Sequence, residues 1–388
     1  MTSKGKKKVQ DIHIGKKYSM RSNVLKEERP YWVYLPGSYD ESNKQQKYPV
    51  LYLLDGDAHF PSASGVVQFM SSGINGNCQI PEMIVVAIPN TDRTRDLSPT
   101  HSDIGYTGQK EAFLKSSGGG DAFLKFIREE LFPQIDSKFH TQHLRVLVGH
   151  SFGGLLAIHA LLAEPEMFYG YIAIDPSLWW DNELLIQNAE KKIKAIRKLR
   201  KSLYISSANT PKILNSNRMK MRRSIRKFVK TLEPAQTENF RLGVQFFNAE
   251  DHGSVPLLSL YHGLLFVFEG FKRVGIESLP AMKTRFRRLS KRWGADVLPG
   301  EGYVNTLGYM ALYRMKYVKR AIAFFEYNIS SFPRSANAYD SLAEAYRVKG
   351  DKEQAIKYYK KSLELDPNNQ NAARFLRELT EKKETVGA

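Results

Sequence analysis

The sequence predicts an α/β protein in which a mostly parallel sheet, flanked by helices, precedes a smaller all-α region. Two observations lead to this prediction. Over residues 31–271, short apolar segments alternate with amphipathic segments of helical spacing, which is the pattern of strand–helix–strand units. Residues 302–369 instead contain two copies of a 34-residue helical repeat, which is typical of a stacked helical array.

The expected strands are short, rich in β-branched or aromatic residues, and bounded by turn residues. They cover residues 31–35, 49–54, 83–88, 144–148, 170–174, 202–206 and 240–247. Helical spacing predicts helices over residues 121–135, 154–163 and 257–271, and a long basic helix before the last strand. Because parallel strands end at one edge of a sheet, we expect a functional site at their carboxyl ends.

Length and composition agree with two folded domains. The chain has 388 residues, of which 42% are hydrophobic and 25% are charged, as in folded soluble proteins. The predicted limits are residues 1–275 for the α/β domain, 276–300 for a helical linker and 301–388 for the repeats. Cys78 is the single cysteine, so no intramolecular disulfide can form. We expect a packed thiol there rather than a nucleophile.

The formal net charge of +18 predicts attraction to anions such as an acidic small substrate, an acidic lipid or nucleic acid. Basic residues cluster at 191–201, 218–230 and 283–292, in segments with helical spacing. We interpret these clusters mainly as solvated faces of amphipathic helices. Aromatic residues that could stack on bases are not interleaved with them, so nucleic-acid binding is the weakest interpretation.

The sequence also bears on location. The basic start, residues 1–8, is not followed by the apolar segment of a signal peptide. No apolar run approaches the length of a membrane span. We therefore expect a cytoplasmic or periplasmic protein without a membrane span.

The repeats at 302–335 and 336–369 have the packing pattern of a tetratricopeptide (TPR) repeat. Corresponding positions in the two copies are Ala321 and Ala355, Ile322 and Ile356, Phe325 and Tyr359, and Pro333 and Pro367. The first copy is weaker, because Asn305 and Leu312 stand where large aromatic residues are usual. Residues 370–381 resemble a cap helix. Because two repeats are fewer than usually stand alone, we expect them to pack on the α/β domain or to bind a second subunit or another protein partner.

The strongest chemical signal is Gly149-His150-Ser151-Phe152-Gly153, which fits the G-x-S-x-G turn that presents a nucleophilic serine between a strand and a helix. Glycine at both ends of the motif avoids collisions in this tight turn. A predicted strand precedes the motif and a predicted helix follows it, which is the expected context. Ser151 is therefore the candidate nucleophile.

A serine needs a base, and His252 is the best candidate. It follows the last predicted strand, and Gly253 gives the loop freedom to turn the ring over the sheet. His262 lies in a helical pattern and is expected to be packed. His140 and His143 precede the motif's strand, and no carboxylate or cysteine completes a metal site there. We expect neither a metal nor a cofactor.

The orienting acid is open. Four carboxylates are candidates: Asp175, Asp181, Glu250 and Asp251. The loop after strand 202–206, where an acid is expected, offers Asn209 but no carboxylate. A Ser–His pair without an acid is the alternative.

An acyl-transfer site also needs donors for an oxyanion. We expect one from the N–H of Phe152. The second is expected from the loop after strand 49–54, at Asp57 with Gly56 beside it.

Several segments together resemble the bacterial "putative esterase" family, which includes enterobactin (ferric siderophore) esterases and S-formylglutathione hydrolase/esterase D. The matching stretches are residues 29–36, 48–57, 89–99, 130–133, 149–154, 176–180 and 250–255. The resemblance implies an α/β-hydrolase fold and carboxylic-ester hydrolysis through an acyl-enzyme, with Ser151 and His252 in the catalytic roles. It is greatest for the siderophore-esterase branch, whose members can work with a Ser–His pair. That family reads Ser-Pro-Ser where this chain has Asp175-Pro-Ser177, so Asp175 is a departure and a possible substitute acid.

Substrate contacts are expected from Arg93 and Arg95, in a loop at the active edge, and from Trp179 and Trp180 in a matching stretch. The arginines would anchor an anionic ester; the alternative is a salt bridge to Asp92 or Asp96. The rival to an esterase is a hydrolase-fold scaffold of weak or lost activity that recruits a partner through its TPR segment.

Overall fold

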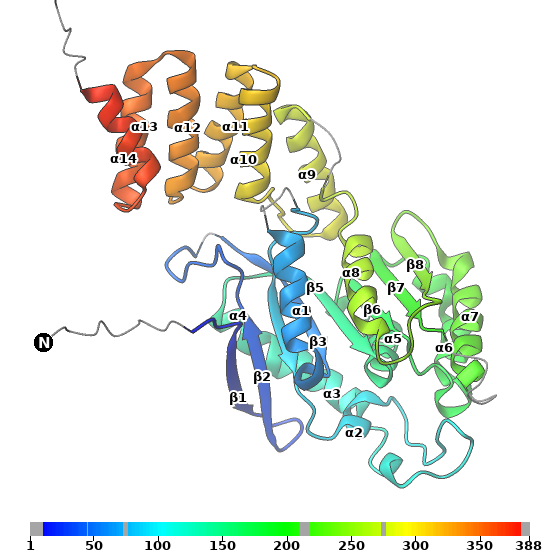
Figure 1. Cartoon of the computed structure of the whole chain (residues 1–388). Coiled ribbons are helices and arrows are strands. Elements are labelled where there is room, and N and C mark those ends of the chain that lie inside the picture. Colours follow the sequence, from blue (N-terminus) through cyan, green and yellow to red (C-terminus); the bar gives the residue numbers. More distant parts are fainter. Residues whose placement is uncertain (1–10, 45, 73–76, 210–217, 273–276, 382–388) are drawn as a thin grey trace, which may run out of the picture. The chain divides into compact units, whose positions relative to one another are not determined.

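The computed structural model describes residues 11–44, 46–72, 77–209, 218–272 and 277–381 (Figure 1). The chain divides into two compact units, one of residues 1–68 and 83–267 and the other of residues 69–82 and 268–388. The domain limits expected from the sequence stay a prediction. The basic start at residues 1–8, and Thr210 and Pro211 of the loop expected to supply an acid, lie outside the described residues.

The first unit is built on one sheet whose described strands run in the order β1-β2-β4-β3-β5-β6-β7-β8. The strands are β1 (Lys16–Arg21), β2 (Glu28–Tyr34), β3 (Tyr48–Leu54), β4 (Ile84–Ile88), β5 (Thr141–His150), β6 (Gly170–Ile174), β7 (Lys201–Ser207) and β8 (Phe240–Phe246). β2 pairs antiparallel with β1 and β4. The pairs from β4 through β8 are all parallel, which confirms the predicted mostly parallel sheet.

Helices cover both faces of this sheet. They are α1 (Gly56–Ser71), α2 (Arg93–Leu97), α3 (Gly120–Phe126), α4 (Phe132–Lys138), α5 (Phe152–Ala163), α6 (Trp180–Ile196), α7 (Arg218–Leu232) and α8 (Val255–Val267). In Figure 1, α1 and α8 lie in front of the sheet, while α5 packs with α2 and α6, and α6 with α7. A π-helical turn at Ile127–Leu131 joins α3 to α4, so the predicted helix over residues 121–135 is one continuous helical stretch.

The core follows from the hydrophobic pattern. Every residue of β3, β4 and β6 is buried, as expected for strands covered on both faces. α5 is apolar nearly all round, and ten of its residues are buried. A helix of this kind is stable only inside a protein, and it holds the turn at its N-terminus against the sheet.

The second unit is helical. Its described helices are α9 (Leu279–Trp293), α10 (Glu301–Tyr309), α11 (Val318–Ser331), α12 (Ala336–Lys349), α13 (Lys352–Leu365) and α14 (Gln370–Thr380). α10 and α11 correspond to the first predicted repeat, α12 and α13 to the second, and α14 to the cap helix. Ala343 and Ala355 are fully buried, so the helices approach closely at these small residues.

Two sequence expectations can be read directly from the described residues. Cys78 is buried, and burial raises the pKa of its thiol to about 11, which leaves it protonated at neutral pH. None of the described helices combines the length and hydrophobicity needed to cross a bilayer.

Candidate active site

Three strands of the parallel sheet are each followed directly by a non-glycine residue with left-handed backbone. Asp55 follows β3 with φ 53°, Ser151 follows β5 with φ 60°, and Asp175 follows β6 with φ 39°. Side chains rarely adopt this backbone because Cβ crowds the neighbouring peptide. Strained residues of this kind gather at functional sites, and here they lie at the sheet edge where the sequence predicts one.

Neighbouring strands hold Ser151 in its turn. Its N–H donates to Ile174 O at 2.9 Å, and its carbonyl accepts from Ser177 N at 3.1 Å. Gly149 cannot carry a side chain, because a Cβ there would lie 2.2 Å from the carbonyl carbon of Gly153. The requirement for glycine at this position of the motif, predicted from the sequence, therefore has a structural cause: a side chain would collide with the backbone of Gly153.

The ring of His252 is held by Asp175. Nδ1 lies 2.7 Å from Asp175 Oδ2, and the other oxygen of this buried carboxylate accepts from Ala208 N at 3.2 Å. A carboxylate accepts the proton on Nδ1, which leaves Nε2 free to act as a base. The carboxylate that contacts His252 thus stands at the end of β6, where the sequence departs from the pattern of the family that it resembles.

The other acid candidates do not reach this ring. Glu250 contributes its backbone carbonyl to Asn209 N. Asp181 accepts from Thr100, and Asp251 accepts from the N–H groups of residues 253 and 254. Among the described residues, Asp175 is therefore the carboxylate that pairs with His252.

The hydroxyl of Ser151 has a different neighbour from the one expected. Within the described residues, its hydrogen-bond partner is Ser177 Oγ at 3.3 Å, rather than the ring of His252. Such catalytic hydrogen bonds are often long in unliganded enzymes and shorten when substrate binds. Ser177 was not predicted as a neighbour of the Ser151 hydroxyl, although it lies in the Asp175-Pro-Ser177 segment that departs from the family pattern.

Two helix N-termini meet at this edge. Phe152 begins α5, and Asp57 lies in the first turn of α1, where N–H groups have no intrahelical acceptor. Asn90 Nδ2 donates to Asp57 Oδ1 at 3.1 Å, which fixes the start of α1. Gly56 packs so closely that a Cβ would lie 2.8 Å from Ile88 N. The predicted oxyanion donors therefore lie in the first turns of two helices, and their role stays a prediction.

Arg93 does not present a free charge to the site. Its Nε and Nη2 bind the two oxygens of Asp55 at 2.6 and 3.0 Å, and Nη2 also donates to His150 O at 3.3 Å. The expected alternatives were an anionic substrate or a salt bridge to Asp92 or Asp96. The partner is instead Asp55, which braces the strained turn after β3.

Arg95 is neutralised as well. It pairs with Asp96 and Glu27, and the fully buried Arg29 binds the same two carboxylates. The hydrogen bond from Arg95 is the main cause that lowers the pKa of Glu27. Arg95 thus forms the salt bridge to Asp96 that the sequence offered as the alternative to substrate anchoring.

Trp179 and Trp180 are core residues. They are 7% and 1% exposed, and Trp180 Nε1 donates to Thr100 Oγ1 at 3.2 Å. Their rings pack edge-on against each other and against Phe152. Both rings therefore support the start of α5 from within the core, and their contact with substrate stays a prediction.

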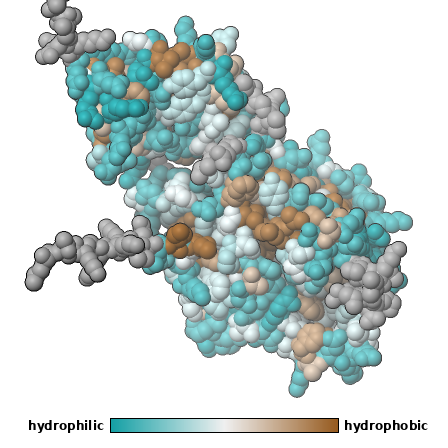
Figure 2. Space-filling model, viewed as in Figure 1, coloured by the Kyte–Doolittle hydropathy of each residue, from teal (hydrophilic) through white to brown (hydrophobic). Residues whose placement is uncertain are grey.

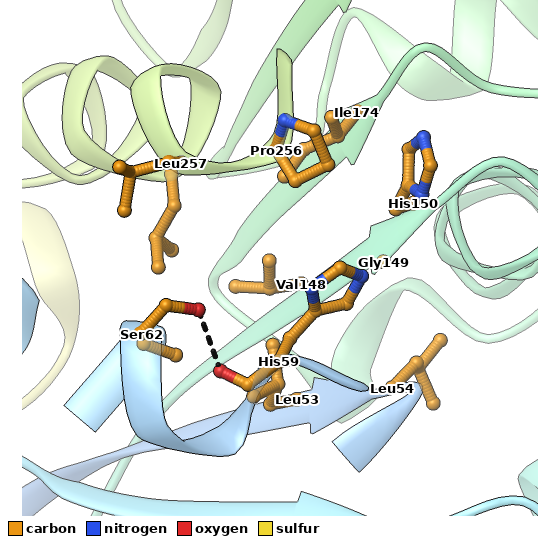
Figure 3. A pocket seen from close by; sticks show the side chains of 12 residues that line it. Leu53, Leu54, His59, Ser62, Val148, Gly149, His150, Ile174, Pro256 and Leu257 are labelled. Carbon is orange, nitrogen blue, oxygen red and sulfur yellow. Dashed lines mark hydrogen bonds between the residues drawn. The ribbon is translucent and has the colours of Figure 1, made fainter. Parts of the chain in front are cut away.

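A small apolar pocket lies beside the candidate base, between α1 and α8 (Figure 3). His150 and His59 line it, and the His150 ring lies 4.4 Å from the ring of His252. Burial, together with the two neighbouring histidines, lowers the pKa of His150 to about 3. His150 therefore stays neutral at physiological pH and does not oppose a positive charge on His252. Leu257, which lines the pocket, is 51% exposed. Figure 2 shows an apolar area on this face of the molecule.

Comparison with known proteins decides the family. The family model described as "Putative esterase" matches residues 22–226, which is more than half of the chain. The chain belongs to this esterase family. A tetratricopeptide-repeat model matches residues 336–369, which confirms the second predicted repeat.

Several relatives of this chain are siderophore esterases by name. A siderophore triacetylfusarinine C esterase of Aspergillus fumigatus is 29% identical over 160 residues, 39% of this chain and 51% of that protein. The ferri-bacillibactin esterase BesA of Bacillus subtilis is 27% identical over 220 residues, 54% of this chain and 76% of that protein. The chain thus spans only about half of the Aspergillus relative.

A solved structure extends the likeness. The IroE-like serine hydrolase from Shewanella oneidensis is 32% identical and has a TM-score of 0.71, with 82% of this chain and 99% of that chain covered. The predicted α/β-hydrolase fold is therefore confirmed.

Proposed function

We propose that this protein hydrolyses carboxylic esters, with Ser151 as nucleophile, His252 as base and Asp175 as orienting acid. The observation that carries the proposal is the 2.7 Å pair between His252 Nδ1 and Asp175 Oδ2, beside a serine in a strained strand-to-helix turn. Such a pair gives imidazole the tautomer that accepts a proton at Nε2 and stabilises the imidazolium that forms. Membership of the esterase family supports the same reaction.

The first half of the reaction forms an acyl-enzyme. Ser151 Oγ attacks the ester carbonyl while His252 Nε2 takes its proton. The oxyanion is stabilised by the N–H groups of Phe152 and Asp57, and the positive end of α5 adds to this field. His252 then gives the proton to the departing alcohol, whose C–O bond breaks.

The second half releases the acid. Water attacks the acyl carbonyl, His252 takes its proton, and the proton returns to Ser151 Oγ as the acyl bond breaks. Ser177 lies 3.3 Å from Ser151 Oγ and gives the serine hydroxyl an alternative partner between turnovers. The reaction uses only groups of this chain and water.

For the substrate, we propose a siderophore-type or other anionic ester. The names of the relatives support the first, and the net charge of +18 supports an anion. The TPR segment is proposed to bind a protein partner or a second copy of the chain. A scaffold of weak or lost activity is the competing function, and the same segment would serve it.

The test is a Ser151→Ala variant assayed on p-nitrophenyl butyrate, together with labelling by a fluorophosphonate probe. We expect wild type to hydrolyse the ester and to take up the probe at Ser151, and the variant to do neither. Ser330→Ala, at an exposed serine of α11, is the matched control and should retain both. If wild type is not labelled at neutral pH, or if Ser151→Ala keeps turnover, the esterase assignment is wrong and the scaffold is favoured.

A further inference from the structure

Two arginines of α7 flank one aromatic ring at the active edge of the sheet. The guanidinium carbons of Arg222 and Arg226 lie 5.0 and 5.3 Å from the centroid of Phe246. Phe246 is the last residue of β8, and α7 lies beside β8 in Figure 1. We call these three residues the α7 arginine cluster.

Arg222 is held in place by neutral groups. Its Nη1 donates to Asn209 Oδ1 at 3.0 Å and its Nη2 to Asn248 Oδ1 at 2.9 Å. An amide oxygen orients a guanidinium but leaves its positive charge uncompensated. The hydrogen bonds thus fix the position of Arg222 and preserve its charge.

The cluster is next to the proposed catalytic residues. Asn209, which binds Arg222, follows Ala208, whose N–H donates to Asp175 at 3.2 Å. Asn248 lies in the loop that leads from β8 to His252, and Asn209 Nδ2 binds the carbonyl of Asn248 at 2.7 Å. Arg222 therefore contacts the two loops that lead to the acid–base pair, one beside Asp175 and one before His252.

The charges of this cluster are only partly balanced, because the charge of Asp175 acts on Arg222 and opposes the lowering of its pKa. Among the described residues, neither Arg222 nor Arg226 forms an ion pair with a carboxylate, whereas Arg93 and Arg95 both do. The adjoining segment 210–217 contains no Asp or Glu in its sequence. Burial, and after it the charge of Arg226, lower the pKa of Arg222, as expected for two like charges held together.

We propose that the α7 arginine cluster binds an anionic group of the ester substrate, a carboxylate or phenolate attached to the acyl or alcohol part. The proposal rests on the proposed esterase function. Guanidinium groups bind such oxygens through paired N–H donors, and Arg226 is exposed to solvent. The cluster then selects substrates by charge. From the sequence, anchoring of an anionic ester was one of two alternatives for Arg93 and Arg95.

The first test compares two esters of equal chain length. One is p-nitrophenyl valerate, which is neutral, and the other is mono-p-nitrophenyl glutarate, which carries a free carboxylate. In the Arg222→Gln/Arg226→Gln variant, we expect the ratio of kcat/KM for glutarate to that for valerate to fall about tenfold, mainly through KM, as for the loss of charge-assisted contacts. The control is Arg223→Gln/Lys230→Gln, which removes the same charge from exposed positions of α7 and should keep the wild-type ratio.

The second test does not depend on turnover. Benzoate is titrated into the full-length Ser151→Ala protein by calorimetry, with and without the two arginine substitutions. We expect the substitutions to raise the Kd about tenfold, and 0.5 M NaCl to weaken binding to Ser151→Ala itself.

The outcomes separate the two proposals. An unchanged ester ratio, an unchanged benzoate Kd, or equal losses in the control variant would overturn the anion site while esterase activity stands. Arginine-dependent benzoate binding in a protein that hydrolyses neither ester would overturn the esterase function and leave the anion site. Melting temperatures of all variants within a few degrees of wild type show that the substitutions leave the fold intact.

Discussion

The sheet unit and the helical unit use left-handed backbone in opposite ways. In the helical unit, α9 and α12 end in Gly294 and Gly350, with φ of 65° and 86°, although two non-glycine residues of this unit, Cys78 and Lys316, also have positive φ. In the sheet unit, the residues after β3, β5 and β6 have the same sign of φ but are Asp55, Ser151 and Asp175. A side chain in this region costs roughly 1–2 kcal/mol.

The difference shows where the chain needs a side chain and where it needs only a change of direction. At the ends of α9 and α12, left-handed backbone lets a following N–H group reach one of the last carbonyls, and glycine adopts this backbone without strain. The residues that follow the three strands are also the proposed nucleophile, its proposed acid and the carboxylate that binds Arg93. Their strain accompanies chemistry that glycine cannot supply.

The largest expected effect concerns Asp175. Replacing it with Asn removes the carboxylate that selects the His252 tautomer, so we expect kcat to fall about 10³-fold with little change in KM. Steady-state kinetics on p-nitrophenyl butyrate measure this loss. Glu250→Gln is the matched control and should stay within about twofold of wild type. If the two variants lose similar activity, Asp175 is not the orienting acid and the strain at β6 has another origin.

A smaller effect is expected from His150. Burial lowers its pKa from 6.5 to about 3, so between these pH values the unfolded chain binds more protons than the folded one. The free energy of unfolding therefore falls as pH drops below about 6.5, by up to about 1.4 kcal/mol per pH unit. Between pH 7 and pH 5, wild type should lose up to about 2 kcal/mol more than His150→Gln.

Urea denaturation of each protein at pH 7 and at pH 5 gives its change in the free energy of unfolding, and these changes are then compared between wild type and His150→Gln. His59→Gln is the control. It replaces another histidine of the same pocket but leaves the His150 ring in place, so it should keep the pH-dependent loss that is due to His150. Equal losses in wild type and His150→Gln would mean that the His150 ring is protonated in the folded protein.

The smallest expected effects test the cost of a side chain at positive φ in the two units. Ser151→Gly should be more stable than Ser151→Ala by about 1 kcal/mol, because only glycine relieves the strain at φ 60° and ψ −114°. Gly350→Ala should be less stable than wild type by about 1 kcal/mol. Calorimetric melting measures both. At both positions glycine is expected to be more stable than alanine, and an alanine variant as stable as its glycine counterpart would contradict backbone strain at that position.

Much of the fold could be predicted because the decisive patterns are local. Continuous apolar runs predicted β3, β4 and β6, and the 34-residue period predicted the helical repeats. β1 was missed because its sequence, Lys-Lys-Tyr-Ser-Met-Arg, is polar and half exposed at the sheet edge. α1 was missed because Pro61 and two glycines lower its helix propensity.

The site was predictable only in part, for a related reason. Ser151 lies in a contiguous motif, and His252 follows from strand order. Asp175 could be named only as one of several acids, because its contact with His252 joins residues 77 positions apart. The partner of Arg93 is 38 positions away, and sequence pattern carries no record of such pairings. For this reason, the sequence left both alternatives open for the two arginines, an anionic substrate or a salt bridge.

The strand order has a consequence for folding kinetics. Asp55, Ser151, Asp175 and His252 follow β3, β5, β6 and β8, so the site exists only when most of the parallel sheet is paired. Non-local strand pairing is slow, whereas contacts between consecutive helices form quickly. During refolding, the helical repeats are expected to regain their circular dichroism first. Reactivity toward a fluorophosphonate should return last and would time the completion of the sheet.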